Sequence, residues 1–495
     1  MTAEKKYLAF DLGAESGRGV AGFFDGERLR QEDVHRFANG PVQVFDSRHW
    51  DVLRLFAELK TALGLATAAH GKDWSGIGID SWGADFGLLD RADELIGNPR
   101  HYRDPLFDGS IEAACAVVPR ETIYGRTGIQ FLQFNTLLQL HAMKRSNAPA
   151  LDAAKTLLFI PDLLNFWFTG VKATEFTIAS TGQMLEPFTR SWAIDLIESF
   201  GLPAEILTPL IEPGAKIGEL RGDIAAEAGC GQTPFFAPAE HDTGSAIVAV
   251  PATAADTAYI SSGTWSLLGV ELDSPRVSDA TRNANFTNEG GVCGTTRLLK
   301  NVMGLWLIQE CRRVWARQSE PYSYGDLTRL AQAAAPFQAL IDPDDAAFFA
   351  PAAMPEAIRR FCVKTGQQPP ESAGATVRCC LESLALKYRW GIEKLEEFRG
   401  AKISVIHIVG GGARNALLCQ LTADATGRQV IAGPIEATAT GNLLMQMLGN
   451  GDIATLAEAR EIVRRSFDLT VYKPSSERGA WDDAYGRLLQ IVVFG

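Results

Sequence analysis

The sequence has 495 residues, of which 46% are hydrophobic and 21% are charged, a composition typical of soluble globular proteins and a length that predicts two domains. Its formal net charge of −12 at pH 7 excludes the basic face with which proteins bind nucleic acids or anionic membranes. No apolar run is long enough to cross a membrane and no signal peptide precedes Asp11, so we expect a cytoplasmic protein. The eight cysteines lack the spacing of a zinc site or a disulfide framework.

The chain begins with a predicted β-hairpin. Residues 7–10 form a short apolar run, residues 11–17 contain the turn glycines, and residues 20–24 return toward Asp25-Gly26, which predicts a second turn and a third strand. Residues 50–69 carry apolar side chains at helical spacing, and apolar runs at 77–80 and 86–89 predict strands. Strands followed by a helix and further strands indicate a mixed α/β fold.

The middle of the chain, residues 122–201, is predicted to be mainly helical. Its clearest helices cover residues 135–145 and 161–168, the second with a proline in its first turn. Residues 201–230 are rich in glycine and proline, and we expect them to form surface loops. They lead into an apolar strand that ends just before Asp242.

The second half repeats the opening pattern of the first. Residues 258–260 and 267–270 predict two strands around a glycine turn, which suggests a duplicated core. Further on we expect a helix at 376–397, a buried strand at 403–409, a helix from Gly412 through Leu417, and a helix at 437–448. We place the boundary near residues 247–257, which gives domains at 1–247 and 248–495 that touch extensively.

Glycine turns follow predicted strands at three places, residues 11–18, 261–264 and 410–412. Backbone amides in such turns can bind phosphate, and three of them indicate a nucleotide held between two domains. No P-loop motif occurs. Residues 17–22 match the spacing of a dinucleotide fingerprint, but they lie in a predicted strand instead of opening a helix, which excludes that interpretation.

Two aspartates are placed for chemistry. Asp11 directly precedes the first glycine turn, where it could bind a phosphate-bound Mg²⁺, or it could simply initiate the turn. Asp242 lies in His241-Asp242-Thr243 between two apolar runs, where it could cap a helix or accept the proton of a substrate hydroxyl. The two roles of Asp242 are compatible, and an ordinary pKa near ~4 would suffice for the second.

Six motifs, in order along the chain, resemble those of the FGGY family of carbohydrate kinases. They are Asp11-Leu-Gly-Ala-Glu-Ser-Gly-Arg18, Gly78-Ile-Asp-Ser-Trp-Gly-Ala-Asp-Phe86, Ser261-Ser-Gly-Thr-Trp-Ser-Leu267, Thr287-Asn-Glu-Gly-Gly291, Leu299-Lys-Asn-Val-Met-Gly-Leu-Trp306 and His407-Ile-Val-Gly-Gly-Gly412. The resemblance implies an α/β fold of two actin-like (ribonuclease H-like) ATPase domains with the active site in the cleft between them.

The activity that the resemblance implies is phosphorylation of a small-molecule ketose with ATP and Mg²⁺. The expected substrate is L-rhamnulose, phosphorylated at its C1 hydroxyl; the alternatives are L-fuculose, L-ribulose and D-xylulose, whose recognition depends on a few hydrogen bonds that spacing does not reveal. A non-catalytic actin-like regulator that binds ATP or sugar is the alternative of a different class. We expect a monomer or a homodimer.

The resemblance also assigns roles to residues, with Asp242 as the catalytic base and Asp11 at the metal. The expected substrate-binding residues are Gly83, Gln130, Asn135, His241, Asp242, Thr243 and Asn301. The expected nucleotide-binding residues are Ala14, Glu15, Ser16, Gly17, Arg18, Thr264, Gln309 and Gly411, and Asn301 also matches a nucleotide-side position. Phe131 and Phe134, next to Gln130, either line the sugar pocket or pack in the core.

The chain departs from the family pattern at three places. Glu15 puts an acid beside the phosphates, where Arg18 or Mg²⁺ would have to offset its charge. Glu240 puts a second acid next to the expected base. Around Arg103-Asp104-Pro105 the second arginine common in such kinases is absent. Whether Cys362 and Cys379 come close together is left open.

Overall fold

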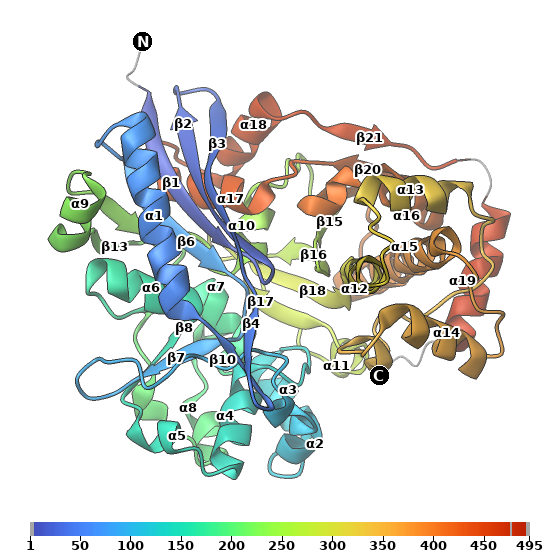
Figure 1. Cartoon of the computed structure of the whole chain (residues 1–495), viewed down its shortest axis with the longest axis horizontal. Helices are drawn as coiled ribbons and strands as arrows, with labels where there is room; N and C mark the ends of the chain where they lie inside the picture. Colours follow the sequence, from blue (N-terminus) through green and yellow to red (C-terminus); the bar gives the residue numbers. More distant parts are fainter. Residues whose placement is uncertain (1–3, 476–477, 492–495) are drawn as a thin grey trace.

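The computed structural model describes residues 4–475 and 478–491. Two large β-sheets lie side by side, the first on the left of Figure 1 and the second toward its centre and right. The first sheet has the strand order β13-β14-β6-β1-β2-β3 and the second has β17-β18-β16-β15-β19-β20-β21. This is the mixed α/β architecture that the sequence predicts.

The strands of the first sheet come from both ends of the first half. They are β1 (Lys5–Leu12), β2 (Ser16–Phe24), β3 (Leu29–Ala38), β6 (Gly76–Ser81), β13 (Lys216–Glu219) and β14 (Pro234–Phe236). The three opening strands pair antiparallel, whereas β6 pairs parallel to β1 and to β14. The predicted hairpin and its third strand are confirmed.

The second sheet repeats this arrangement and adds one strand, β17, at its edge. Its strands are β15 (Thr257–Ser262), β16 (Trp265–Leu272), β17 (Thr287–Gly290), β18 (Thr296–Met303), β19 (Val405–Val409), β20 (Gln429–Ala432) and β21 (Thr470–Tyr472). Strand β15 pairs antiparallel to β16 and parallel to β19, as β1 does with β2 and β6. Outward from there, β18, β20 and β21 take the places of β3, β14 and β13 with the same directions. The suggested duplication of the core is therefore present in the topology.

Helices cover the outer faces of both sheets. Apolar side chains of α1 (Val52–His70) and α6 (Ile160–Thr169) pack on the first sheet, and those of α15 (Ala373–Arg399) and α16 (Ala416–Thr426) pack on the second. The predicted helices at 50–69, 161–168 and 376–397 match α1, α6 and α15. The helix expected to end at Leu417 instead continues to Thr426, where Gly427 ends it in a left-handed conformation.

Two helices lie between the sheets, near the centre of Figure 1. They are α10 (Asp242–Val248) and α17 (Ala437–Gly449), which pack on each other within a core shared by both halves. From the second half, α17 reaches back to the first sheet, where Asn442 Nδ2 donates to Asp80 Oδ2 at 2.6 Å and Gln446 Nε2 donates to the Leu8 carbonyl oxygen at 3.1 Å. The two halves are thus joined by a continuous interior.

Residues 90–230 contain a subdomain of short elements at the lower left of Figure 1. Its helices are α2 (Ser110–Cys115), α3 (Arg120–Thr127), α4 (Thr136–Arg145), α5 (Pro149–Ala153), α7 (Phe176–Ala179) and α8 (Ile194–Ser199). Helix α9 (Gly222–Ala228) instead packs beside α1, at the far left of Figure 1. The expectation that residues 201–230 form only surface loops is wrong, because β13 extends the first sheet and α9 buries Ile224 in its core. Short elements between glycines and prolines carry too few apolar positions to show a period.

The remaining elements are small strand pairs and peripheral helices. The strands are β4 (Pro41–Val44), β5 (Ser47–Trp50), β7 (Phe86–Leu89), β8 (Thr156–Phe159), β9 (Thr174–Glu175), β10 (Leu185–Glu186), β11 (Ser191–Trp192) and β12 (Leu210–Ile211). The helices are α11 (Asp279–Asn283), α12 (Trp306–Arg317), α13 (Tyr324–Ala333), α14 (Met354–Lys364), α18 (Leu456–Ser466) and α19 (Gly479–Ile491). Within the described residues, no helix has the length and apolar character needed to span a bilayer. The cysteines are free thiols, and those of Cys362 and Cys379 lie close enough to affect each other's pKa.

Candidate functional site

A cavity of about 350 Å³ lies where the β1–β2 turn of the first half faces the β15–β16 turn of the second. All three glycine turns singled out in the sequence line this cavity, the third of them through Gly410 and Gly411. The expected site residues that line it are Asp11, Ala14, Ser16, Gly83, Gln130, Asn135, His241, Asp242, Thr243, Thr264, Asn301 and Gly411. Residues far apart in sequence thus meet at one place.

Four expected site residues do not line this cavity. Gly17 lies within β2, where Phe37 packs against it so closely that a Cβ would collide with the ring. Gln309 lies on α12, and Glu15 and Arg18 are engaged by ion pairs described below.

Asp242 is the first residue of α10, and its carboxylate opens onto the cavity. Its Oδ1 accepts hydrogen bonds from the Thr243 backbone N at 2.5 Å and from Thr243 Oγ1 at 3.2 Å, and His241 Nε2 lies 3.4 Å from it. The prediction that Asp242 caps the helix is wrong by one position, because His241 occupies the N-cap without a side-chain cap.

The pKa of Asp242 also differs from the expectation of an ordinary value. Burial raises it, His241 and the Thr243 amide lower it, and Asp11 raises it further. The net shift is upward, because the loss of hydration destabilises the carboxylate more than His241 and the Thr243 amide stabilise it. A raised pKa makes Asp242 a stronger proton acceptor than a surface aspartate.

Arg18 joins the two halves beside the first glycine turn. Its Nη2 and Nε donate to Asp11 Oδ2 at 2.6 and 2.9 Å, and its Nη1 contacts Glu436 at the start of α17. The side chains of Arg18 and Asp11 are about one-tenth exposed, so these ion pairs are well shielded from solvent. Arg18 is therefore fully occupied and does not offset Glu15.

Glu15 instead meets a cation from the opposite half. Its Oε1 lies 3.3 Å from Arg313 Nη2 on α12, and both side chains are nearly half exposed. The expected repulsion at the phosphate turn is thus reduced by Arg313, although a solvent-exposed pair of this kind contributes only ~0–1 kcal/mol.

Three aspartates gather at the carboxyl ends of the first parallel strands. Asp11 on β1 and Asp80 on β6 are register partners, and Asp11 raises the pKa of both Asp80 and Asp242. Burial raises the pKa of Asp80 well above its usual value, as do Asp11 and Asp242. The buried Asp80 Oδ1 has no hydrogen-bond partner within the described part of the chain.

These carboxylates fit Mg²⁺ held mainly by phosphate oxygens. Among the described residues no group of three or more His, Cys, Asp or Glu side chains has the arrangement of a protein-only metal site. Mg²⁺ is usually held by one or two carboxylates together with substrate phosphates and water, and Asp11, which lines the cavity, could supply one carboxylate oxygen.

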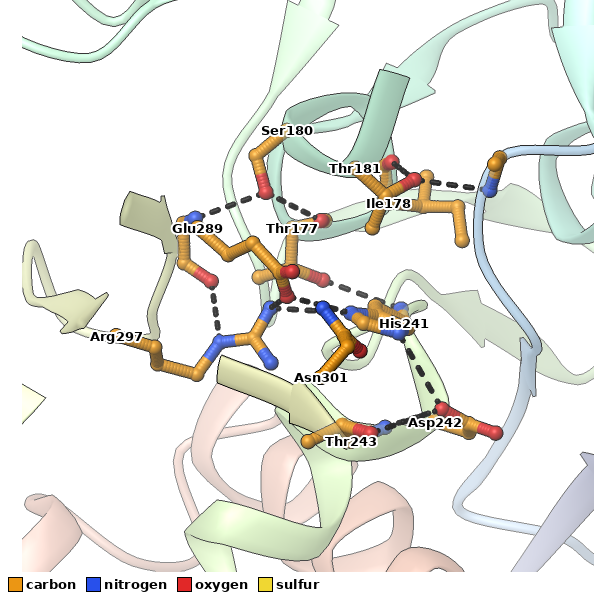
Figure 2. Close-up of polar contacts among 12 residues, drawn as sticks. Thr177, Ile178, Ser180, Thr181, His241, Asp242, Thr243, Glu289, Arg297 and Asn301 are labelled. Atoms are coloured by element: carbon orange, nitrogen blue, oxygen red, sulfur yellow. Dashed lines mark hydrogen bonds and ion pairs between the residues drawn. The ribbon is translucent and has the colours of Figure 1, made fainter. Parts of the chain in front are cut away.

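One wall of the cavity is supported by the short segment at residues 176–182, part of which is shown in Figure 2. Thr181 Oγ1 accepts from the Ala84 amide at 2.9 Å, which fixes the loop that carries Gly83. A Cβ on Gly83 would lie only 3.0–3.1 Å from atoms of Thr181, so this close approach requires glycine. Thr181 lines the cavity but gave no sequence signal, because it lies in a region read as helical.

Gln130 and Asn301 connect the halves across the cavity. Gln130 Oε1 accepts from the Asn301 backbone N at 2.9 Å and from its Nδ2 at 3.2 Å, while Asn135 Nδ2 donates to the Gln130 carbonyl oxygen at 2.8 Å. The two phenylalanines divide between the expected alternatives: Phe134 lines the cavity and Phe131 packs in a core.

Glu289 is a cavity residue to which the sequence analysis gave no role. It lies at the end of β17, within a motif that carried the family resemblance, and its carboxylate contacts His241 and Arg297. This contact joins residues from opposite halves, so only the folded chain reveals it.

Glu240 does not point at the cavity. Its side chain is 0% exposed and faces Asp162 and Glu175, with Asn165 Nδ2 donating to Oε1 at 2.6 Å. Burial raises its pKa well above the usual value, and Asp162 and Glu175 raise it further. The expected second acid is therefore turned away from the base, and its burial favours the neutral form of its carboxyl group.

Comparison with known proteins agrees with this geometry. The family model described as "FGGY family of carbohydrate kinases, N-terminal domain" matches residues 6–249, and the corresponding C-terminal model matches residues 258–449. A rhamnulokinase of Bacteroides thetaiotaomicron is 44% identical over 97% of this chain and 98% of its own length. A rhamnulokinase of Oceanobacillus iheyensis is 41% identical over 95% of this chain and 99% of its own length.

Among solved structures, a gluconate kinase from Lactobacillus acidophilus superposes with a TM-score of 0.81. It is 16% identical, and the superposition covers 99% of this chain and 98% of that one. At that identity the likeness concerns the fold alone, which is the two-domain kinase fold expected from the sequence.

Proposed function

The chain belongs to the FGGY family of carbohydrate kinases, and from this premise we propose that it transfers the terminal phosphoryl group of ATP to the C1 hydroxyl of L-rhamnulose. The products are L-rhamnulose 1-phosphate and ADP. The substrate is proposed because the chain is similar over nearly its whole length to proteins named rhamnulokinase. The observation that carries the catalytic part is the Asp242 carboxylate, about a third exposed, in a cavity shared by two glycine turns.

In the proposed mechanism Asp242 is the catalytic base. Its carboxylate accepts a hydrogen bond from the C1 hydroxyl and orients that oxygen toward the terminal phosphorus. The O1–P bond forms while the bond from phosphorus to the ADP oxygen breaks, and the proton moves to Asp242 late, because the transition state is loose. The raised pKa of Asp242 favours this transfer.

The remaining expected residues are proposed to position the two substrates. Gly83, His241, Thr243, Gln130, Asn135 and Asn301 would bind the sugar, and Ala14, Ser16, Thr264 and Gly411 would bind the nucleotide by their backbone or hydroxyl groups. Asp11 would hold Mg²⁺, which when bound neutralises charge on the transferring phosphates. In this assignment residues 1–247 carry the sugar site and the base, and residues 248–495 carry most of the nucleotide site.

We also propose that the protein works in the cytoplasm as a monomer or homodimer. The free cysteines support a reducing compartment, since thiols persist there without pairing. The two halves would close over sugar and nucleotide and exclude water from the phosphoryl group.

The substrate is tested by an ADP-release assay with L-rhamnulose, L-fuculose, L-ribulose and D-xylulose. We expect the highest kcat/KM with L-rhamnulose. A higher value with another ketose would move the proposal to that sugar, and no turnover with any of them would favour the non-catalytic regulator.

The base is tested by Asp242→Asn, which we expect to lower kcat by about 10²–10⁴-fold, the usual contribution of a positioned base. Binding of ATP should be retained. Asp279→Asn is a matched control, because Asp279 is also the first residue of a short helix but its side chain is 84% exposed on the surface. Activity of Asp242→Asn within a few-fold of the control would exclude Asp242 as the base.

A further inference from the structure

Glu289 reaches the cavity from the second half and contacts the residue that precedes Asp242. Its Oε2 lies 3.3 Å from His241 Nδ1. On the opposite side of the imidazole ring, His241 Nε2 lies 3.4 Å from Asp242 Oδ1. Figure 2 shows the three side chains in this order. The ring therefore links a carboxylate of the second half to the proposed base of the first.

Arg297 on β18 holds Glu289 in place. Its Nη2 lies 3.3 Å from Glu289 Oε2 and 3.2 Å from His241 Nδ1, and its Nε donates to the Gly290 carbonyl oxygen at 2.7 Å. The arginine and glutamate side chains are only 1% and 5% exposed, and Glu289 is the one carboxylate of the described residues that forms an ion pair with Arg297. A buried guanidinium depends on such a partner, so the pair fixes both side chains.

The backbones on both sides of the contact are anchored to one short segment. The His241 amide donates to Thr177 Oγ1 at 3.2 Å, and the Gly290 amide donates to Ser180 Oγ at 2.8 Å. Both hydroxyls belong to residues 176–182, and Figure 2 shows them side by side. Glu289 and His241 are thus held at a fixed separation by hydrogen bonds independent of their side chains.

We infer that Glu289 is a positioning residue for phosphoryl transfer: with Arg297 it fixes the imidazole of His241, which in turn orients the Asp242 carboxylate. This inference rests on the proposed function of Asp242. Without Glu289, Arg297 has no counter-charge, and the Nδ1 side of the ring keeps only Arg297, which is then held through the Gly290 carbonyl oxygen alone. Displacing a reacting group by about 1 Å can cost up to ~10²-fold in rate.

The arrangement also affects the ionisation of the base. His241 faces Glu289 from β17, Arg297 from β18 and Asp242 from α10, and Asp242 faces Asp11 from β1 and Asp80 from β6. His241 lowers the pKa of Asp242 against the opposing effects of burial and Asp11. A released ring would lose this effect, so the pKa of Asp242 would rise. Since the base must be ionised to accept a proton, activity would then fall at a higher pH on the acid side.

The test compares Glu289→Gln, Glu289→Asp and Glu382→Gln with the unmodified enzyme, using the ketose that it phosphorylates fastest. Glu382 is a matched control, since its buried carboxylate also pairs with an arginine, Arg378 at 2.6 Å, but lies away from the cavity on α15. The measurements are kcat, KM for both substrates and the pH dependence of kcat. Choosing the ketose in this way separates failure of the inference from a wrong choice of sugar.

For Glu289→Gln we expect kcat to fall at least about tenfold and KM for ATP to stay unchanged. The acid limb, which is the part of the pH profile where kcat falls as the pH decreases, should move to higher pH. Glu289→Asp keeps the charge, so its acid limb should lie nearer that of the unmodified enzyme while kcat is reduced. The inference is overturned if Glu289→Gln keeps the normal kcat and pH profile. It is also overturned if Glu289→Gln and Glu382→Gln lower kcat equally and neither variant moves the acid limb. If Glu289→Gln does not fold, a normal kcat for Glu289→Asp overturns it.

Discussion

Gly441 marks a place where the two central helices leave no room for a side chain. A Cβ built on Gly441 in α17 would lie 2.6 Å from the carbonyl carbon of Ser245 in α10 and 3.2 Å from its Cα. Non-bonded carbon atoms attract at about 3.5–4.0 Å, so Gly441→Ala creates an overlap of about 1 Å with backbone. No side-chain rotation can relieve it, and α10 must move away from α17.

The size of the effect follows from two opposing contributions. Alanine is favoured over glycine within a helix by ~1 kcal/mol. Overpacking of an interior costs ~1–3 kcal/mol and occasionally more, and a clash with backbone belongs at the upper end. We therefore expect a net loss of about 1–3 kcal/mol of stability. Because α10 begins at Asp242, its displacement should also lower kcat.

The assay is the thermal unfolding midpoint together with kcat, measured beside Gly64→Ala. Gly64 lies inside α1, and a Cβ there would meet nothing within 4 Å. The same substitution should thus raise the midpoint at Gly64 and lower it at Gly441. If Gly441→Ala were as stable as Gly64→Ala and fully active, the close approach of α10 and α17 would be refuted.

Two further predictions concern the unexpected glutamates. Burial raises the pKa of Asp162 to about 8 and of Glu175 to about 7, and it also raises the pKa of the neighbouring Glu240. Above ~pH 4 the native state therefore binds more protons than the unfolded chain, so the protein loses stability as the pH rises toward ~8. Glu240→Gln removes one of these groups and should flatten the fall of the unfolding midpoint between about pH 6 and pH 8.5; an equally steep fall would contradict protonation of Glu240. Arg313→Ala leaves Glu15 unpaired and should raise KM for ATP about two- to fivefold at low salt, less at high salt. Adding Glu15→Gln should restore KM, and an unchanged KM in Arg313→Ala would show that this charge does not reach the nucleotide.

Much of the fold was predictable because its main elements carry strong periodic patterns. The apolar runs flanking the turns at residues 11–17 and 261–266 predicted β1, β2, β15 and β16, and long amphipathic or small-residue stretches predicted α1, α15 and α17. The elements missed, such as β13 and α9, are short and lie between glycines and prolines. Their position is decided by pairing with a distant strand, which local sequence does not encode.

The residues of the candidate site also fall into those that the sequence could predict and those that it could not. Residues in turns after strands, such as Asp11, Thr264 and Gly411, could be found because parallel strands bring their carboxyl ends to one edge. Thr181 and the contact of Glu289 with His241 could not, since they depend on how a helical segment and the opposite sheet pack. The burial of Glu240 was hidden for the same reason, as its neighbours Asp162 and Glu175 are distant in sequence.

The duplicated topology explains why one carboxylate is available for chemistry and its counterpart is not. Strand β14 leads into α10 as β20 leads into α17, and each helix starts with an acid, Asp242 at the first position of α10 and Glu436 at the N-cap of α17. Glu436 is bound by two arginines, Arg18 from the opposite half and Arg414 at 2.8 Å. Among the residues that the structure describes, no arginine pairs with Asp242; its hydrogen bonds come from Thr243, and His241 lies beside it. The same position in the two halves thus serves to join the halves in one case and leaves a carboxylate with a raised pKa open to the cavity in the other.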